Sequence, residues 1–155
     1  MLTLSKAKTL VAVAVAGALA LPVLVSSVSA QNDPIAERKA VMKSVGGAMR
    51  DPGQMMRGQA PFDLEKVKAS LKTFAEASGK MGALYPAGSD KGGETTAAPK
   101  IWEAKADFDA RFVKFGNDAK EAMTSITDEA SFKANFPKVA QNCGGCHEVY
   151  RIEKK

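Results

Sequence analysis

Two cysteines and one histidine stand close together near the end of the chain, and no other residue of either type occurs in it. Cys143, Cys146 and His147 spell C-x-x-C-H, the attachment signature of a c-type haem. Two intervening residues on a helical turn set the sulfurs apart by the span between two haem vinyl groups, so both thiols can become thioethers. The neighbouring imidazole then points at the iron from the proximal side. The motif predicts one covalent haem c whose iron is bound by His147.

Three other chemistries of this motif compete with haem attachment. A structural zinc site needs four ligands, usually Cys and His, and the chain has only three such residues. A thioredoxin-like dithiol needs a βαβ context, and no segment of the chain alternates like a strand. A simple disulfide between Cys143 and Cys146 stays open, since an exported protein permits it.

Residues 1–30 have the form of a secretory signal peptide. Two lysines begin it, residues 10–25 are an apolar run, and Val28-Ser29-Ala30 resembles a signal peptidase site. The run is short for a membrane span, and Pro22 interrupts it. We expect cleavage after Ala30 and export to the periplasm; an uncleaved membrane anchor is the alternative.

Residues 31–155 are long enough for one domain with one core. The whole chain has a formal net charge of +5, and two of these charges are Lys6 and Lys8 of the signal-like segment. The remaining +3 would fall close to neutrality with two haem propionates. This weak charge argues against nucleic acid as a partner. No later segment is apolar enough to span a bilayer, so no membrane span is expected after signal cleavage. The chain offers no Ser/His/Asp set and no phosphate loop, so we do not expect an enzyme.

Four segments show the apolar period of an amphipathic helix. They cover residues 34–50, 64–81, 99–125 and 128–150. Asp33 and Asp63 are expected to cap the first two segments, and Thr127 the fourth. Amphipathic helices with mostly short connections predict an all-α fold, an antiparallel four-helix bundle that can hold a cofactor between its helices.

Proline and glycine mark the expected interruptions. Residues 85–98 are rich in Gly, Pro, Ser and Thr and predict a loop. Pro137 lies inside the fourth segment and is expected to kink or split it, so that the haem-bearing helix starts near Phe136. The haem is expected between the first, third and fourth helices. Its predicted neighbours are Met42, Phe108 or Phe112, and Val139.

The position of the motif limits the sixth ligand of the iron. His147 lies eight residues from the end of the chain, and no methionine follows it. A sixth protein ligand must therefore come from upstream, across the bundle. The methionines available are Met42, Met49, Met55, Met56, Met81 and Met123.

Four groups of residues carry a resemblance to a known family. They are Arg38 with Met42, residues 58–63 (G-Q-A-P-F-D), residues 99–102 (P-K-I-W), and Cys143-x-x-Cys146-His147-x-x-x-Arg151. With these residues the chain resembles the class II cytochromes c, the group of cytochrome c′ and its low-spin c-556 relatives. The resemblance implies an antiparallel four-helix bundle with haem near the C-terminal helix, often a homodimer packed through the first two helices.

The resemblance also implies roles for three further residues. In cytochrome c′ the position of Met42 usually leaves the iron five-coordinate, whereas in the low-spin members a methionine there binds it. Met42 is thus implied as the sixth ligand, with packing against the haem face as the alternative. Arg38 is implied near a haem propionate, or else as an exposed charge. Arg151, one turn after His147, is implied to cover the imidazole and tune its basicity.

These features predict a periplasmic electron carrier that passes single electrons between redox protein partners, with iron bound by His147 and Met42. The alternative is a five-coordinate cytochrome c′ that binds or detoxifies nitric oxide or carbon monoxide. A thiol–disulfide enzyme using Cys143 and Cys146 is the third hypothesis, and it requires that no haem be bound.

Overall fold

The structure, a computed structural model, describes residues 33–153. The predicted signal peptide, residues 1–30, lies outside the described residues, and its cleavage stays a prediction. The described part consists of α1 (Pro34–Ala48), α2 (Arg50–Met56), α3 (Leu64–Met81), the 3₁₀ turn η1 (Gly82–Leu84), α4 (Lys100–Glu103), α5 (Lys105–Ser125) and α6 (Glu129–Tyr150).

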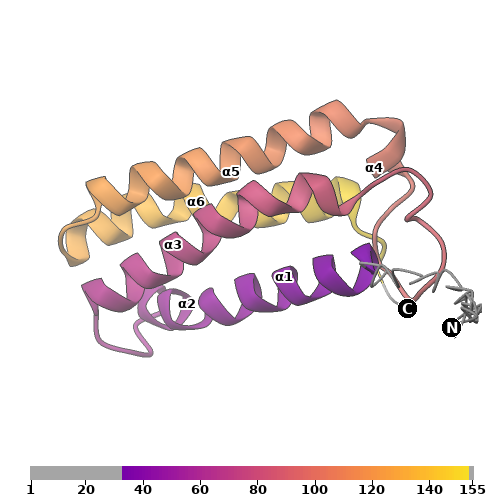
Figure 1. Ribbon diagram of the computed structural model, residues 1–155. Coiled ribbons are helices and arrows are strands. Elements are labelled where there is room, and N and C mark those ends of the chain that lie inside the picture. Colours follow the sequence, from indigo (N-terminus) through magenta and orange to yellow (C-terminus); the bar gives the residue numbers. More distant parts are fainter. Residues whose placement is uncertain (1–32, 154–155) are drawn as a thin grey trace, which may run out of the picture. The chain divides into compact units, whose positions relative to one another are not determined.

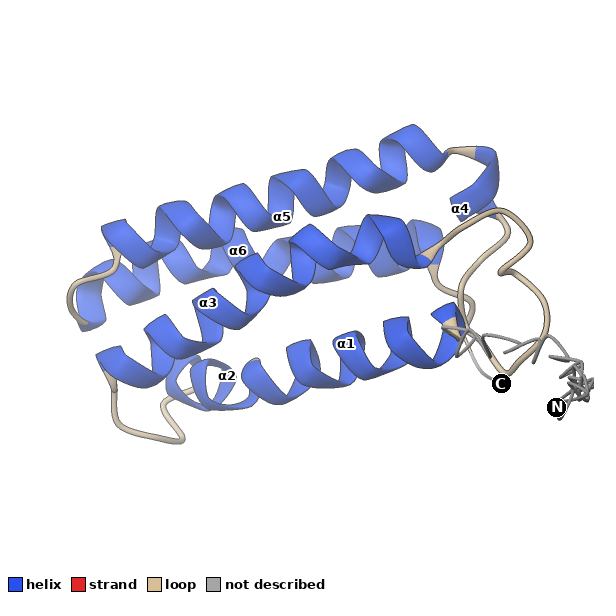
Figure 2. Cartoon of the chain, in the orientation of Figure 1, coloured by secondary structure: helices blue, strands red, loops and turns tan. Residues whose placement is uncertain are grey.

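The four long helices α1, α3, α5 and α6 form an antiparallel bundle (Figure 1). Helix α3 packs against both α1 and α5, and α5 packs against α6. Figure 2 draws no strand among residues 33–153, where the only extended pairing is an isolated bridge between Ala97 and Arg151. The predicted all-α four-helix bundle is confirmed.

Side-chain caps explain where the long helices begin. Asp33 accepts hydrogen bonds from the backbone N–H groups of Ile35 and Ala36 at 2.9 and 3.1 Å, and Asp63 caps α3 in the same way. At α6 the cap is Asp128 and not Thr127 as predicted. A capping box decides this, because Asp128 accepts from the Ser131 N–H at 2.8 Å while the Ser131 hydroxyl accepts from the Asp128 N–H at 3.0 Å.

Two of the predicted helices are interrupted. The first segment breaks at Met49 and continues as α2, which the sequence analysis did not predict. The break places Pro52 in the first turn of α2, where a missing N–H is tolerated. The third segment breaks at Ala104, whose φ of −127° and ψ of 45° are not helical. This break lets α4 bury Ile101, which is 1% exposed.

Pro137 was predicted to kink or split the fourth helix, and the predicted split is wrong. Helix α6 runs from Glu129 to Tyr150 with Pro137 inside it, so the haem-bearing helix does not start near Phe136. Proline removes a single backbone hydrogen bond at this point. The capping box at the start of α6 and the burial of Phe132 and Phe136, 0% and 1% exposed, hold the helix on the N-terminal side of the proline.

The buried side chains form two apolar clusters. The larger one joins all four long helices and includes Leu71, Phe74, Phe115, Phe132 and Phe136. Val139, predicted to face the haem, belongs to this larger cluster. The smaller cluster lies at the end of the bundle that carries the C-x-x-C-H, and it contains Met81, Tyr85, Ile101, Phe108, Phe112 and Tyr150.

Candidate haem-binding site

A cavity of about 750 Å³ lies beside the smaller cluster. Its walls come from α1, α5, α6 and the loop of residues 85–98. Among residues 33–153, α1 and α6 have little direct contact with each other, and the cavity occupies the space between them. Its lining includes Met42, Phe108, Phe112, Cys143, Cys146 and His147. A cavity of this size with mostly apolar walls is typical of a cofactor site.

The C-x-x-C-H lies in the last two turns of α6. Because the helix is continuous there, Cys143, Cys146 and His147 share one face at spacings of three and four residues, and all three line the cavity. Both cysteines are half-buried free thiols, so the simple disulfide does not form in this structure. Two thiols and an imidazole on one wall fit the attachment of a single haem c.

Burial shapes the acid–base chemistry of the motif. It raises the pKa of the Cys143 and Cys146 thiols, so both are protonated at neutral pH. Partial desolvation on the cavity side lowers the pKa of His147, and the charge of Arg151 acts in the same direction. His147 is therefore neutral at pH 7, which is the form of imidazole that binds a metal.

Met42 faces the same cavity from the opposite wall. It is half-buried on α1 and packs at the edge of the smaller cluster, and it lines the cavity with the C-x-x-C-H. Only the fold brings these residues together, since Met42 lies about a hundred positions before His147 in the chain.

Arg151 ends α6 and also lines the cavity. Its exposed side chain follows His147 by one turn, while its backbone pairs with Ala97 of the loop. The neighbouring Ile152 N–H donates to the Thr96 carbonyl at 2.8 Å, and the Ala98 N–H donates to the Tyr150 carbonyl at 3.0 Å. The loop of residues 85–98 is thus tied to the end of the haem-bearing helix.

Arg38 does not line the cavity. It is 2% exposed, and its guanidinium donates to the Ser89 carbonyl and hydroxyl at 2.8 and 3.1 Å and to the Thr95 hydroxyl at 3.1 Å. The guanidinium also lies 4.7 Å from the centre of the Tyr85 ring. Arg38 is neither an exposed charge nor a direct wall of the cavity; it holds the loop that forms part of that wall.

Arg111 is a cavity residue that the sequence analysis missed. Its Nε donates to Asp107 at 2.8 Å, and its Nη1 donates to the carbonyl of Gly145, between the two cysteines, at 2.8 Å. The spacing of four between Asp107 and Arg111 could have suggested their ion pair. The contact with Gly145 joins residues 34 positions apart, and no local sequence pattern predicts it.

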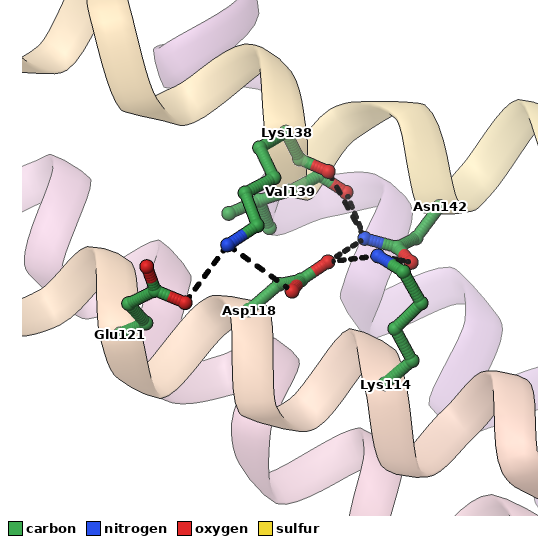
Figure 3. A network of polar contacts seen from close by, with 6 residues as sticks. All are labelled: Lys114, Asp118, Glu121, Lys138, Val139 and Asn142. Atoms are coloured by element: carbon green, nitrogen blue, oxygen red, sulfur yellow. Dashed lines mark hydrogen bonds and ion pairs between the residues drawn. The ribbon is translucent and has the colours of Figure 1, made fainter.

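A second polar network ties α5 to α6 (Figure 3). Asp118 is only 8% exposed and accepts from Lys114 at 2.5 Å and from Asn142 at 2.8 Å, while Lys138 lies 3.8 Å away. Burial would raise the pKa of Asp118, but these hydrogen bonds and nearby charges outweigh burial and lower it. Asn142 also lines the cavity and directly precedes Cys143, so the network anchors the start of the haem motif.

This network predicts a measurable effect on stability. Replacing Asp118 by asparagine should lower the free energy of unfolding by about 1–2 kcal/mol at pH 7, because a charge-assisted acceptor is lost. A carboxyl whose pKa is lowered in the folded state stabilises the fold above its unfolded pKa, and this contribution disappears as the pH falls. The difference between wild type and Asp118→Asn should therefore shrink below about pH 4.

Urea unfolding of the holoprotein at pH 7 and pH 3, followed by circular dichroism, measures this difference. Glu121→Gln is the matched control, because Glu121 contacts the same Lys138 at 2.8 Å but is exposed; its effect should stay below about 1 kcal/mol. Equal effects of the two variants, or an Asp118 effect that does not change with pH, would contradict the assignment.

The bundle and the cavity-facing C-x-x-C-H define the class of four-helix haem c proteins. The chain belongs to the cytochrome c′ family: the family described as "Cytochrome C'" matches residues 33–151. Haem c, with its iron and its thioether bonds to the two cysteines, is the cofactor of this family, and the cavity and the donor set described above fit it.

Relatives include both branches of the family. The chain is 47% identical over 125 residues to a cytochrome c′ of Rhodopseudomonas palustris, covering 81% of this chain and 86% of the relative. It is 35% identical over 121 residues to a cytochrome c-556 of Agrobacterium tumefaciens, covering 77% and 98%.

The solved structures agree with this family assignment. The structure of the R. palustris cytochrome c′ matches with a TM-score of 0.79 and 46% identity over 81% of this chain and all of the other. A structure of R. palustris cytochrome c556 matches with a TM-score of 0.73 and 29% identity, covering 81% and 100%. In the part of the chain that the structure describes, no helix is long and apolar enough to cross a membrane.

Proposed function

We propose that this protein is a periplasmic electron carrier that passes single electrons between redox protein partners. Cys143 and Cys146 would hold the haem, and His147 and Met42 would bind its iron from opposite sides. The observation that carries the proposal is that Met42 lines the same cavity as the C-x-x-C-H, from the facing helix. His/Met ligation raises the reduction potential of a haem.

The chain's own residues support this role by holding the site rigid. When bound, the haem iron supplies the one-electron change. Neutral His147 presents its nitrogen lone pair from α6, and the Met42 thioether comes from α1. Phe108 and Phe112, 2% and 8% exposed, form the apolar wall on α5. A site with both ligands on packed helices needs little rearrangement when the charge on the iron changes.

We further propose how the two arginines act on the cofactor. Arg151, at the mouth of the cavity, covers the imidazole and tunes its basicity. Arg38 contributes its charge at the propionate end from behind the loop of residues 85–98, because its hydrogen bonds hold it there. Neither arginine makes a bond to the iron, so substitutions of either should shift the potential less than a change of Met42.

A five-coordinate cytochrome c′ that binds nitric oxide or carbon monoxide is the second candidate. The specific observation in its favour is the 47% identity to the R. palustris cytochrome c′, which exceeds the 35% identity to the A. tumefaciens cytochrome c-556. Under this candidate Met42 packs over the open face of the haem without binding the iron.

Spectroscopy of the purified holoprotein tests the proposal. A low-spin ferric spectrum with a methionine–iron charge-transfer band, and slow uptake of carbon monoxide, is the expected result. A high-spin ferric spectrum with rapid ligand uptake would transfer the assignment to the second candidate. A protein without haem would leave the thiol–disulfide enzyme as the remaining hypothesis.

The proposal also covers the location and the oligomeric state of the protein. We place it in the periplasm because of the signal-like residues 1–30, and we propose a homodimer packed through α1 and α3. Mass spectrometry of the exported protein should find a chain that begins after Ala30 and carries one haem that survives acid–acetone extraction. A chain that keeps its leader, or haem that extracts freely, would overturn these points.

A further inference from the structure

Tyr150 has a hydrogen bond that electron transfer through the iron does not explain. Its ring is 4% exposed and lines the haem cavity, on the same helix as the C-x-x-C-H. Its hydroxyl donates to the Asp107 carboxylate at 2.5 Å, in the range of short, charge-assisted bonds between a hydroxyl and an anion. The hydroxyl of this buried ring at the cofactor cavity is thus hydrogen-bonded to a proton acceptor that is exposed to solvent.

The carboxylate is held in place for this contact. Arg111 donates to the same Oδ2 of Asp107 at 2.8 Å, and its guanidinium lies 5.3 Å from the centre of the Tyr150 ring. The charge of Arg111 is therefore balanced by the ion pair. The pKa of Asp107 is lowered, first by the hydrogen bond from Tyr150 and then by Arg111, so the carboxylate is ionised at neutral pH and has an oxygen placed to receive the phenolic proton.

We propose that Tyr150 and Asp107 form a proton-coupled electron donor at the haem cavity, which supplies an electron when a peroxide oxidises the holoprotein. A phenol gives up an electron readily only if its proton leaves at the same time, because the protonated radical is a very strong acid. The hydrogen bond to Asp107 provides that exit. This role of Tyr150 and Asp107 is distinct from the transfer of single electrons between protein partners. It rests on the proposed function only because it requires the haem.

The step balances in electrons and protons. The reduction of hydrogen peroxide to two water molecules consumes two electrons and two protons, and the solvent supplies these protons. In the reduced holoprotein, a haem iron going from ferrous to ferric would supply one electron, and Tyr150 supplies the other. The phenolic proton passes to the Asp107 carboxylate, which leaves a neutral tyrosyl radical beside a neutral carboxylic acid. Because Asp107 is exposed, it can return this proton to the solvent.

The other tyrosine provides an internal comparison. The chain has two tyrosines, and Tyr85 also lines the cavity and is buried. Its ring lies 4.7 Å from the Arg38 guanidinium, and burial raises its pKa to about 12. Within residues 33–153 no carboxylate is hydrogen-bonded to the Tyr85 hydroxyl. Tyr85 therefore lines the same cavity as Tyr150, without the proton acceptor and with a cation against its ring.

The test is electron paramagnetic resonance of the reduced, ferrous holoprotein frozen within milliseconds to seconds after mixing with hydrogen peroxide. Wild type and Tyr85→Phe should both give a tyrosyl radical, Tyr150→Phe should lose it, and Asp107→Asn should reduce its yield at least several-fold. Phenylalanine keeps the ring and its packing on Phe108, 5.2 Å between ring centres, so the Tyr150→Phe bundle should stay folded. Each protein is also tested in a Met42→Leu background, so that access of peroxide to the iron does not limit the result.

Three outcomes would overturn the proposal. They are a tyrosyl signal that persists in Tyr150→Phe, a signal that disappears in Tyr85→Phe, and the absence of any tyrosyl signal in both backgrounds. The absorption spectrum of every sample reports haem content and spin state first. A failure of the proposed haem site therefore appears as missing haem, whereas a failure of this inference appears as a radical in the wrong place or none at all.

Discussion

The Cys143→Ala/Cys146→Ala double variant is expected to lose its haem and, with it, most of the cooperative unfolding of the bundle. The cavity of about 750 Å³ separates α1 from α6, which have little direct contact of their own among the described residues. Removing the cofactor leaves both helices facing a void. Large-to-small changes in cores show that unfilled volume destabilises by about 24 cal/mol per Å³ when the walls cannot collapse.

That coefficient overstates the effect for a cavity that is open to water and can close. Even a loss of about 5 kcal/mol, however, is comparable with the whole stability of a domain of this size. We therefore expect an apoprotein that keeps helical structure but loses fixed side-chain packing at the haem end. The larger apolar cluster meets the cavity only at its edge, through residues such as Phe115. Its remaining members, which include Phe74 and Phe132, should retain residual order.

Urea unfolding followed by far- and near-ultraviolet circular dichroism measures the loss. The single variant Cys143→Ala is the control, because Cys146 can still form one thioether and His147 can still bind the iron; its transition should stay cooperative. An apoprotein with well-dispersed side-chain resonances and a wild-type transition would show that the bundle does not depend on the haem.

The second large effect is expected at the distal wall. Met42→Leu should convert a low-spin ferric iron to high spin, open the distal face to carbon monoxide and nitric oxide, and lower the reduction potential. The reason is occupancy: an external ligand must otherwise displace a thioether carried on a packed helix. Leucine has nearly the same volume, so packing should change little.

The expected drop in potential is on the order of 60–120 mV. For one electron, about 59 mV corresponds to a tenfold change in the equilibrium between the oxidised and reduced protein. Redox titration measures the drop in potential, and the ferric absorption spectrum measures the change of spin state.

Met49→Leu is the matched control for this change. Met49 is also half-buried, also lines the cavity, and lies two turns further along the same side of the bundle, so its substitution should leave the spin state and the potential unchanged. If wild type and Met42→Leu are both high-spin and alike, Met42 is a packing residue, and the five-coordinate cytochrome c′ becomes the proposed function.

Local signals in the sequence predicted most of the helices. Asp33 and Asp63 cap α1 and α3 as expected, because the bonds that make a cap join residues two or three positions apart. The errors fell where tertiary packing overrides a local preference. Pro137 did not split α6, since buried phenylalanines on the preceding turns outweigh one missing hydrogen bond, and the breaks at Met49 and Ala104 follow from what α2 and α4 bury.

The C-x-x-C-H can be recognised from local sequence. With no other cysteine or histidine in the chain, it identifies haem c as the cofactor and predicts the attachment sites and the proximal ligand, because all three residues lie within five positions. Which distant residues meet that motif depends on tertiary packing. Met42 faces it across the cavity, Arg111 holds the Gly145 carbonyl, and Tyr150 reaches Asp107, while Arg38 turns away to clamp the loop. These contacts join different helices, and their geometry depends on how α1, α5 and α6 pack, which no spacing along one helix encodes.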